Sequence, residues 1–206
     1  MQIKFREVRK EDFEVLENII RETWHYDEFC SPKTAAKLSS VFFSSCLTNQ
    51  TFSCVALCDD KPVGIILAKD SAIHKCPLKY RLKQIKSIVS LYLSKEGRKA
   101  SKIFGNVNGI DKKLLAGINK SYPAELALFA VDPSCRGKGI GKKLFNSVLD
   151  YLKGQNIKEF YLFTDTSCNY GFYEHQGLVR RGEMTHVFNI KGQTATMNFF
   201  IYDYHI

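Results

Sequence analysis

The sequence predicts a single α/β domain built on a mixed, mostly antiparallel β-sheet with helices on its faces. Three observations support this fold class. The chain has 206 residues, 45% of them hydrophobic, which is enough apolar material for one core of ordinary size. Short apolar runs typical of strands alternate with segments of helical periodicity. In the second half a strand, a helix and a strand follow one another, an order that indicates at least one parallel pair.

The individual elements follow from the spacing of apolar residues. Alternation and β-branched runs predict strands at 2–8, 51–58, 62–69, 125–131, 159–164, 178–190 and 195–204, the last two joined around 191–193. Apolar residues recurring every three or four positions predict helices at 11–26, 34–47, 78–93, 140–154 and 171–175. Asp59-Asp60-Lys61 separates the second and third strands, so we expect these two to form a hairpin.

The composition argues against a membrane-spanning or secreted protein. No stretch approaches the roughly 18 uninterrupted apolar residues that a membrane span needs. The first seven residues carry charges where a signal peptide needs an apolar run. The seven cysteines include no CxxC pair and no zinc-type spacing. We therefore expect a cytoplasmic protein of a reducing compartment, with no metal site and no membrane partner.

The net charge of +9 comes from one region of the chain. Residues 77–120 hold eleven Lys or Arg against two acidic residues, so the remainder is close to neutral. A basic region concentrates anions, although the same charges also suit the solvated face of helices. We interpret the segment as a basic helical insertion in one domain of residues 1–206, ragged around Gly97, Gly105 and Gly109. Its few scattered aromatic residues make no stacking platform, so we expect no nucleic-acid partner.

A glycine-rich loop between a buried strand and an amphipathic helix is the strongest local signal. Arg136-Gly137-Lys138-Gly139-Ile140-Gly141 places three glycines in five positions, which leaves backbone N–H groups uncovered. The first turn of the following helix adds unpaired N–H donors and a partial positive charge. Together with the basic side chains around it, including Lys142 and Lys143, the loop predicts a diphosphate pocket.

Two common diphosphate motifs do not fit this loop. The Walker pattern requires Ser or Thr where this chain has Lys143, and the dinucleotide pattern GxGxxG differs from the GxGxG spacing found here. The alternative without a ligand is a glycine-rich turn that only starts a helix.

The loop and a second segment resemble the two motifs of the GNAT (GCN5-related N-acetyltransferase) superfamily. In Val-Asp-Pro-Ser-Cys-Arg-Gly-Lys-Gly-Ile-Gly, residues 131–141, Arg136, Gly139 and Gly141 fill the acetyl-CoA signature Arg/Gln-x-x-Gly-x-Gly/Ala. Asn-Tyr-Gly-Phe-Tyr-Glu-His-Gln-Gly-Leu, residues 169–178, is similar to the second motif, an Asn, then Phe-Tyr, then Gly-Phe, with Leu at the last position.

This resemblance is strong over about 122–182 and excludes the basic segment 77–120. It implies a three-layer fold around a twisted, mixed and mostly antiparallel sheet. It also implies transfer of an acetyl group from acetyl-CoA to a primary amine of a small molecule or a protein. A non-catalytic CoA-binding regulatory module is the alternative function, and a homodimer is left open.

The resemblance further implies a binding path for acetyl-CoA. The backbone of Phe129, Ala130 and Val131 would hold the pantetheine arm like an added strand, in a splay between the strands at 125–131 and 159–164. Asn169 would hydrogen-bond the same arm. The N–H groups of Arg136, Gly137, Lys138, Gly139, Ile140 and Gly141 would hold the pyrophosphate, with Arg136, Lys138 and Lys142 as charge partners. The basic segment would either lie near the 3′-phosphate or cover the acceptor site and favour an acidic substrate.

Two residues would carry the chemistry by their motif positions. Tyr173 would protonate the thiolate leaving group, and Glu125, which begins its strand, would act as the base. A carboxylate of ordinary pKa, near 4.3, is a weak base for an ammonium, so burial would have to raise the pKa of Glu125. His175 and His186 are weaker alternatives. A packed aromatic and an exposed strand-end glutamate are the structural alternatives for Tyr173 and Glu125.

The acceptor site is expected at the end of the first helix. Trp24, Tyr26, Asp27 and Glu28 form a polar and aromatic cluster with His25, and in the family this loop commonly walls the acceptor site. We expect Asp27 or Glu28 to attract the ammonium of the acceptor.

Overall fold

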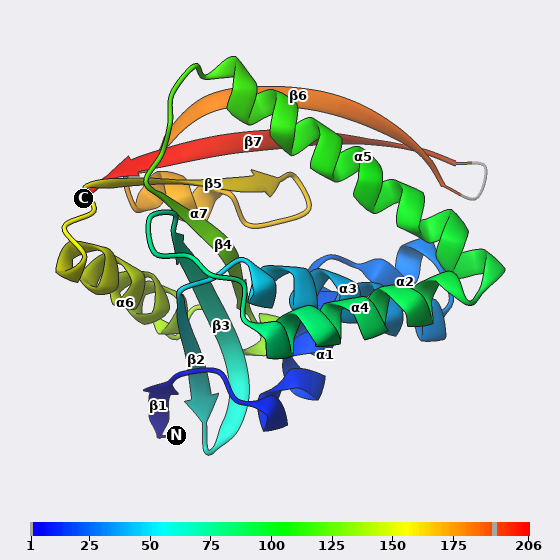
Figure 1. Cartoon of the computed structure of the whole chain (residues 1–206), viewed down its shortest axis with the longest axis horizontal. Helices are drawn as coiled ribbons and strands as arrows, with labels where there is room; N and C mark the ends of the chain where they lie inside the picture. Colours follow the sequence, from blue (N-terminus) through cyan, green and yellow to red (C-terminus); the bar gives the residue numbers. More distant parts are fainter. Residues whose placement is uncertain (1, 191–192) are drawn as a thin grey trace.

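The computed structural model describes residues 2–190 and 193–206, which form one open sheet of seven strands in the order β1-β2-β3-β4-β5-β7-β6 (Figure 1). Neighbouring strands are antiparallel except β4 and β5, which are parallel. The predicted mixed, mostly antiparallel sheet is therefore confirmed. The strands are β1 (Ile3–Arg6), β2 (Phe52–Cys58), β3 (Lys61–Asp70), β4 (Ala124–Val131), β5 (Glu159–Asp165), β6 (Val179–Ile190) and β7 (Gln193–His205).

Helices cover both faces of this sheet. They are α1 (Phe13–Thr23), α2 (Tyr26–Phe29), α3 (Pro32–Thr48), α4 (Leu78–Tyr92), α5 (Lys95–Gly117), α6 (Ile140–Gly154) and α7 (Gly171–His175), with short 3-10 turns at Lys10–Asp12 and Pro133–Cys135. The apolar stripe of α6, including Leu144 and Phe145, packs on one face. The apolar sides of α1 and α3, including Leu16 and Phe43, pack on the other. The result is the three-layer arrangement that the resemblance implies.

Two predicted helices differ from the observed ones. The helix expected over 11–26 breaks after α1, because His25 adopts a left-handed backbone conformation with a φ of 52°. The basic segment is broken near Gly97 as expected, where α4 turns into α5, but not at Gly105 and Gly109, through which α5 continues. A Cβ at Gly97 would sit 2.0 Å from the Leu91 carbonyl oxygen. The loop expected at 191–193 falls largely on residues 191–192, outside the described part of the chain.

An extra residue in β4 changes which face its side chains occupy. Ala68 of β3 pairs with Leu126 and Leu67 pairs with Leu128, so Ala127 has no partner in the register and forms a β-bulge. Without the bulge, Leu126 and Leu128 would point to the same face. Instead Leu126 packs with α6 and Leu128 with α1 and α3.

The parallel strands β4 and β5 separate almost as soon as they meet. Glu125 and Tyr161 form their one register pair among the described residues, whereas β5 pairs with β7 along its whole length. In Figure 1 the two strands diverge from this point. The splay that the resemblance implies is thus present, and it opens the middle of the sheet.

The helix α5 bridges the two sides of that opening. Ile110 and Leu114 of α5 pack on Phe188, Phe199 and Ile201 of the β6–β7 hairpin. Its N-terminal end lies beside α3 and α4, so the helix crosses from one half of the molecule to the other (Figure 1). The basic insertion therefore forms one wall of the space between β4 and β5.

A buried carboxylate ties β1 to the start of α1. Both guanidinium nitrogens of Arg6 donate to Asp12 at 2.7 and 2.8 Å, and the Arg9 amide donates at 2.8 Å. Burial alone raises the pKa of Asp12, but these hydrogen bonds outweigh burial and hold the pKa below its ordinary value.

We predict that Asp12→Asn lowers the free energy of unfolding by about 2–4 kcal/mol at pH 7, because it leaves Arg6 without its charged partner. The folded-state pKa is depressed, so this stabilisation is present above pH 4 and disappears as the pH falls through the folded pKa. Urea denaturation of both proteins at pH 7 and below pH 4 checks this, with the exposed-pair variant Asp60→Asn as control. Equal stability of Asp12→Asn and wild type at pH 7 would contradict the prediction.

Candidate active site

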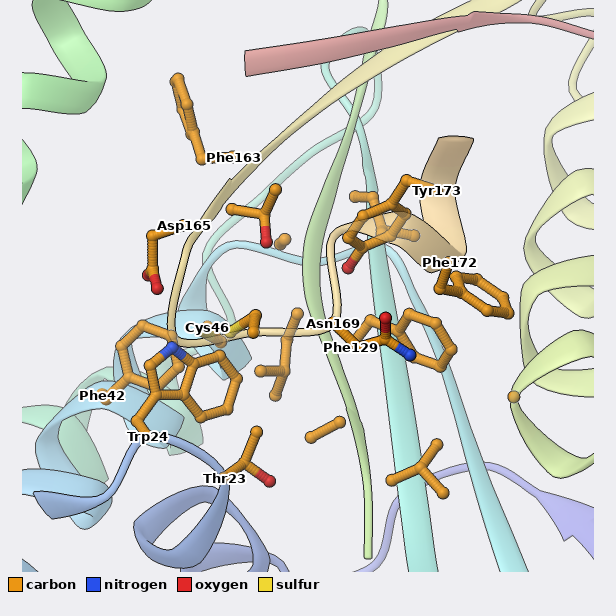
Figure 2. Close-up of a pocket in the computed structure, with 18 of the residues that line it drawn as sticks. Thr23, Trp24, Phe42, Cys46, Phe129, Phe163, Asp165, Asn169, Phe172 and Tyr173 are labelled. Atoms are coloured by element: carbon orange, nitrogen blue, oxygen red, sulfur yellow. The ribbon is translucent and has the colours of Figure 1, made fainter. Parts of the chain in front are cut away.

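A cavity of about 590 Å³ lies in the opening between β4 and β5. Its walls come from the ends of α1 and α3, from α5, from β4 and β5, and from the loop before α6 and the segment that ends in α7. Figure 2 shows the rings of Trp24 and Phe42 gathered on one side, with Phe129, Phe172 and Tyr173 on the other. The cavity thus extends from the glycine-rich loop to the space beside α5 of the basic insertion.

The glycine-rich loop forms one end of the cavity. Gly137 and Gly139 have φ values of 76° and 75°, a left-handed conformation in which a side chain is strained. Within the described residues, the N–H groups from Gly137 to Lys142 donate to no protein acceptor, and helix α6 begins at Ile140. This end therefore offers a cluster of uncovered N–H donors at the positive end of a helix.

The predicted charge partners of this loop separate into two groups. Arg136 and Lys142 line the cavity. Lys138 lies outside the lining, and its ammonium donates to the Ser134 carbonyl at 3.2 Å.

The β4 strand supplies a long wall with a free backbone edge. Phe129, Ala130 and Val131 line the cavity, and no described residue of β5 pairs with them. Asn169 lines the opposite side. A Cβ at Gly141 would lie 3.4 Å from the Phe129 ring, so the glycine lets α6 begin close to this wall. An extended polar chain could pair with such an edge as an added strand.

Tyr173 lies on α7 with its hydroxyl directed into the cavity (Figure 2). Burial raises the pKa of this phenol well above its ordinary value, and nearby Cys168 and Asp165 raise it further. The hydroxyl accordingly keeps its proton at neutral pH. Rings packed around it, including Phe129 at a centroid distance of 6.3 Å, restrict its orientation. Tyr173 can act as a proton donor that is held in place.

Glu125 also lines the cavity, but its carboxylate is already engaged. Lys69 donates to Oε2 at 2.8 Å and Asn49 donates to the same oxygen at 3.1 Å. Burial raises the pKa of the nearby Tyr161, and the charge of Glu125 raises it further. The carboxylate of Glu125 is thus bound to side chains of the protein itself.

Two further carboxylates line the cavity near Glu125. Asp165 ends β5, and Ser167 donates to its Oδ1 through both its amide and its hydroxyl. Burial raises the pKa of Asp165. Asp111 comes from α5, and burial together with the charges of Asp165 and Glu125 raises its pKa to about 7. A carboxyl that titrates near neutrality can both bind and release a proton at working pH.

Aromatic side chains enclose the acidic end. The Trp24 and Phe42 rings are 5.1 Å apart, and Figure 2 shows the Asp165 carboxylate directed toward them. Phe163 and Phe199 also contribute to the lining. Thr23 is buried, and its hydroxyl oxygen has no hydrogen-bond partner among the described residues. An unpaired buried hydroxyl in a cavity wall is a polar group available to a ligand.

The structure brings Trp24 of the predicted acceptor cluster into the cavity lining but not the other members. Tyr26 is buried in the core beneath the lining. Arg21 binds the Asp27 carboxylate at 2.5 Å, and Glu28 is exposed beside His25. The break at His25 explains this placement, because it turns α2 away from the axis of α1.

The acidic end was not foreseen from the sequence. In the sequence, Asp111 is one of two acidic residues in a strongly basic segment, and Asp165 directly follows the strand predicted at 159–164. Neither carries a motif. In the part of the chain that the structure describes, no group of histidine, cysteine and carboxylate side chains is arranged to hold a metal ion.

Known structures share this fold at low sequence identity. PaiA N-acetyltransferase from Thermoplasma acidophilum, solved in complex with coenzyme A, is 18% identical with a TM-score of 0.50 over 100% of both chains. NAA60 from Arabidopsis thaliana, solved with a bisubstrate analogue, is 18% identical with a TM-score of 0.55 over 100% of this chain and 98% of that chain. SsHAT is 14% identical with a TM-score of 0.64 over 100% and 98%. The search of curated proteins found no match.

The family model described as the acetyltransferase (GNAT) family matches residues 13–178. This range runs from the start of α1 to the end of the segment that carries Tyr173. It contains the glycine-rich loop, both diverging strands and every side chain of the cavity discussed above except Phe199. The protein belongs to the acetyltransferase (GNAT) family.

Proposed function

We propose that the protein transfers an acetyl group from acetyl-CoA to the primary amine of a small cationic molecule. The observation that carries the proposal is the opposite character of the two ends of one cavity. One end has uncovered N–H groups with Arg136 and Lys142, and the other has Asp111 and Asp165. The Tyr173 hydroxyl points into the cavity between them.

The loop end fits the diphosphate of coenzyme A. The N–H groups of residues 137–142 would bind its phosphate oxygens, with Arg136 and Lys142 as charge partners. The free edge of β4 at Phe129, Ala130 and Val131 would hold the pantetheine arm, whose amides pair like those of a strand. The presence of coenzyme A in the PaiA structure supports this assignment.

The acidic end fits an ammonium group and its apolar body. Asp111 and Asp165 would draw the cation in and take its proton, since the carboxyl with a pKa near 7 exchanges protons at working pH. The Trp24 and Phe42 rings would contact the rest of the acceptor. The insertion was expected to favour an acidic substrate if it covers this site, but the charged side chain that it contributes to the lining is the Asp111 carboxylate, which favours a cation.

The chemistry then needs few further groups. The amine nitrogen, freed of its proton by the Asp111–Asp165 pair, attacks the thioester carbonyl carbon, and a β4 backbone N–H stabilises the oxyanion. As the carbon–sulfur bond breaks, Tyr173 donates its proton to the departing sulfur. Glu125, bound to Lys69, would position β4 and the nearby charges rather than accept the proton.

A small acceptor fits the enclosure better than a protein terminus. The helix α5 covers the acidic end from one side, and Val107, Asn108 and Asp111 line the cavity. Its packing on the β6–β7 hairpin closes the route along that side. Turnover with a panel of monoamines, diamines and peptides, followed by thiol release, tests the activity. Coenzyme A binding without turnover on any amine would favour the non-catalytic module.

Coenzyme A binding is expected to depend on the left-handed glycine of the loop. Gly139→Val strains a backbone with a φ of 75°, so the N–H groups shift, and we predict at least a 10-fold weaker affinity by isothermal calorimetry. Gly154→Val is the matched control, because it also meets no atom within 4 Å but lies at the far end of α6. Equal affinity of the two variants would contradict the role of the loop.

Removal of the Tyr173 hydroxyl is expected to slow turnover. Tyr173→Phe keeps the ring packing and removes the proton donor, so kcat should fall by about 10²-fold while coenzyme A affinity changes little. Tyr170→Phe, a neighbouring tyrosine outside the cavity lining, should retain wild-type kcat. Steady-state kinetics with an amine identified in the panel checks this, and an unchanged kcat in Tyr173→Phe would remove the residue from the mechanism.

The Asp111 carboxylate is expected to set both acceptor binding and the pH profile. With its pKa near 7, kcat/KM should rise as the pH increases through 7, because only the ionised form binds the cation and takes its proton. Asp111→Asn should raise the acceptor KM by about 10-fold and remove this rise, with coenzyme A affinity unchanged. The exposed control Asp150→Asn should show the wild-type profile. A preserved rise near pH 7 in Asp111→Asn would assign it to another group.

A further inference from the structure

The helix α4 has its apolar side toward solvent. Six large apolar residues of α4 and its C-cap are 50–78% exposed: Leu78, Leu82, Ile85, Val89, Tyr92 and Leu93. The spacing of three or four residues from Leu78 to Tyr92 places five of them on one stripe along the helix, and Leu93 extends it at the C-cap. We call these six residues the α4 stripe. Soluble proteins commonly expose single apolar side chains, but a continuous stripe of this size marks an interaction surface.

The opposite side of α4 buries only Tyr80 and Leu91 among its apolar residues and attaches to α3 through polar contacts as well. Lys37 of α3 donates to the Ser90 carbonyl at 2.7 Å, and Ser40 pairs with Ser87 at 2.9 Å. Gln84 donates to Ser45 at 3.1 Å. An ordinary surface helix buries its apolar side and exposes its polar one, whereas α4 exposes most of its apolar residues. These contacts hold the helix on α3 at the molecular surface (Figure 1).

Basic residues flank the α4 stripe. Lys79, Arg81 and Lys86 lie on α4 and are exposed. Lys95, Arg98, Lys99 and Lys102 follow on the first turns of α5 and are also exposed. Among the described residues, none of these seven side chains forms an ion pair with a carboxylate. The helix thus combines an exposed apolar stripe with unpaired positive charges.

We propose that α4 docks the protein on an anionic lipid surface. The α4 stripe enters the boundary between headgroups and acyl chains, and the flanking lysines and arginines bind lipid phosphates. No helix in the described ranges is long and apolar enough to cross a bilayer, so α4 lies on the surface. The sequence-based expectation of no membrane partner rested on the lack of an apolar stretch long enough to span a bilayer. It did not consider a helix that lies on the bilayer surface.

The positive charges around the α4 stripe favour a lipid surface over a second copy of the chain as the partner of α4. A symmetric dimer through the α4 stripe would bring two clusters of unpaired cations together, and the segment 77–120 contains only two acidic residues to offset them. One of these, Asp111, faces the cavity, and the other, Glu96, hydrogen-bonds to Ser31 and Thr34. An anionic bilayer offers opposite charge together with an apolar interior. The proposal does not depend on the acetyltransferase activity.

Vesicle co-sedimentation of the full chain tests the proposal. We expect binding to vesicles of phosphatidylcholine and phosphatidylglycerol, weakening as salt is raised, and little binding to phosphatidylcholine alone. The variant Leu82→Ser/Val89→Ser should bind at least 10-fold more weakly, and Lys79→Glu/Lys86→Glu should lose the preference for anionic lipid. Val187→Ser, at a comparably exposed position on β6, should bind as wild type does. All five positions are exposed, and thermal unfolding verifies that each variant folds.

A fluorescence probe separates insertion from adsorption by charge. In a Trp24→Phe background, Tyr92→Trp places one indole on the α4 stripe, and its emission should shift to the blue with anionic vesicles as the ring leaves water. Absence of vesicle binding, or binding without this shift, would overturn docking through α4. So would a dimeric mass in light scattering that the Leu82→Ser/Val89→Ser variant reduces to a monomer, because the stripe would then be a contact between copies.

Discussion

The separation of β4 from β5 is the constraint on which the rest of the structure depends. The two parallel strands pair at Glu125 and Tyr161 and then diverge, so the backbone edge of β4 has no partner along the cavity. An unpaired edge inside a folded protein is costly unless another group takes the hydrogen bonds. The bulge at Ala127 lies in the same stretch and rotates the following side chains, so Leu128 faces α1 and α3. A sheet with full pairing at this point would have no room for a ligand.

The two ends of the cavity differ in electrostatic potential. The start of α6 and two basic side chains make one end attractive to an anion, and the end of β5 and the C-terminal half of α5 place carboxylates at the other. The effect of the carboxylates is strengthened because Asp165 is buried and Asp111 is half-buried. The same burial that keeps the proton on Tyr173 brings the pKa of Asp111 to about 7. One cavity can therefore hold a group that gives a proton and a group that takes one.

The basic insertion contributes to two surfaces that face different ways. Its second helix, α5, bridges to the β6–β7 hairpin and supplies Asp111 to the cavity. Its first helix, α4, turns six apolar side chains and several cations outward. The corner between them is tight, since Gly97 leaves no space for a Cβ beside the Leu91 carbonyl. The position of one helix thereby restricts that of the other, which couples the wall of the cavity to the outer surface.

The sequence by itself determined the features that depend on local order. Apolar periodicity located the sheet strands and most helices, and the glycines located the turn with uncovered N–H groups at the start of α6, because backbone conformation and helix ends are properties of adjacent residues. Placement of Asp111, Asp165 and Phe42 in one cavity required the tertiary structure, since these residues lie on separate elements and carry no shared spacing. The direction of α4 also required it: the same apolar period fits a helix that faces the core or one that faces away, and only the contacts with α3 decide which.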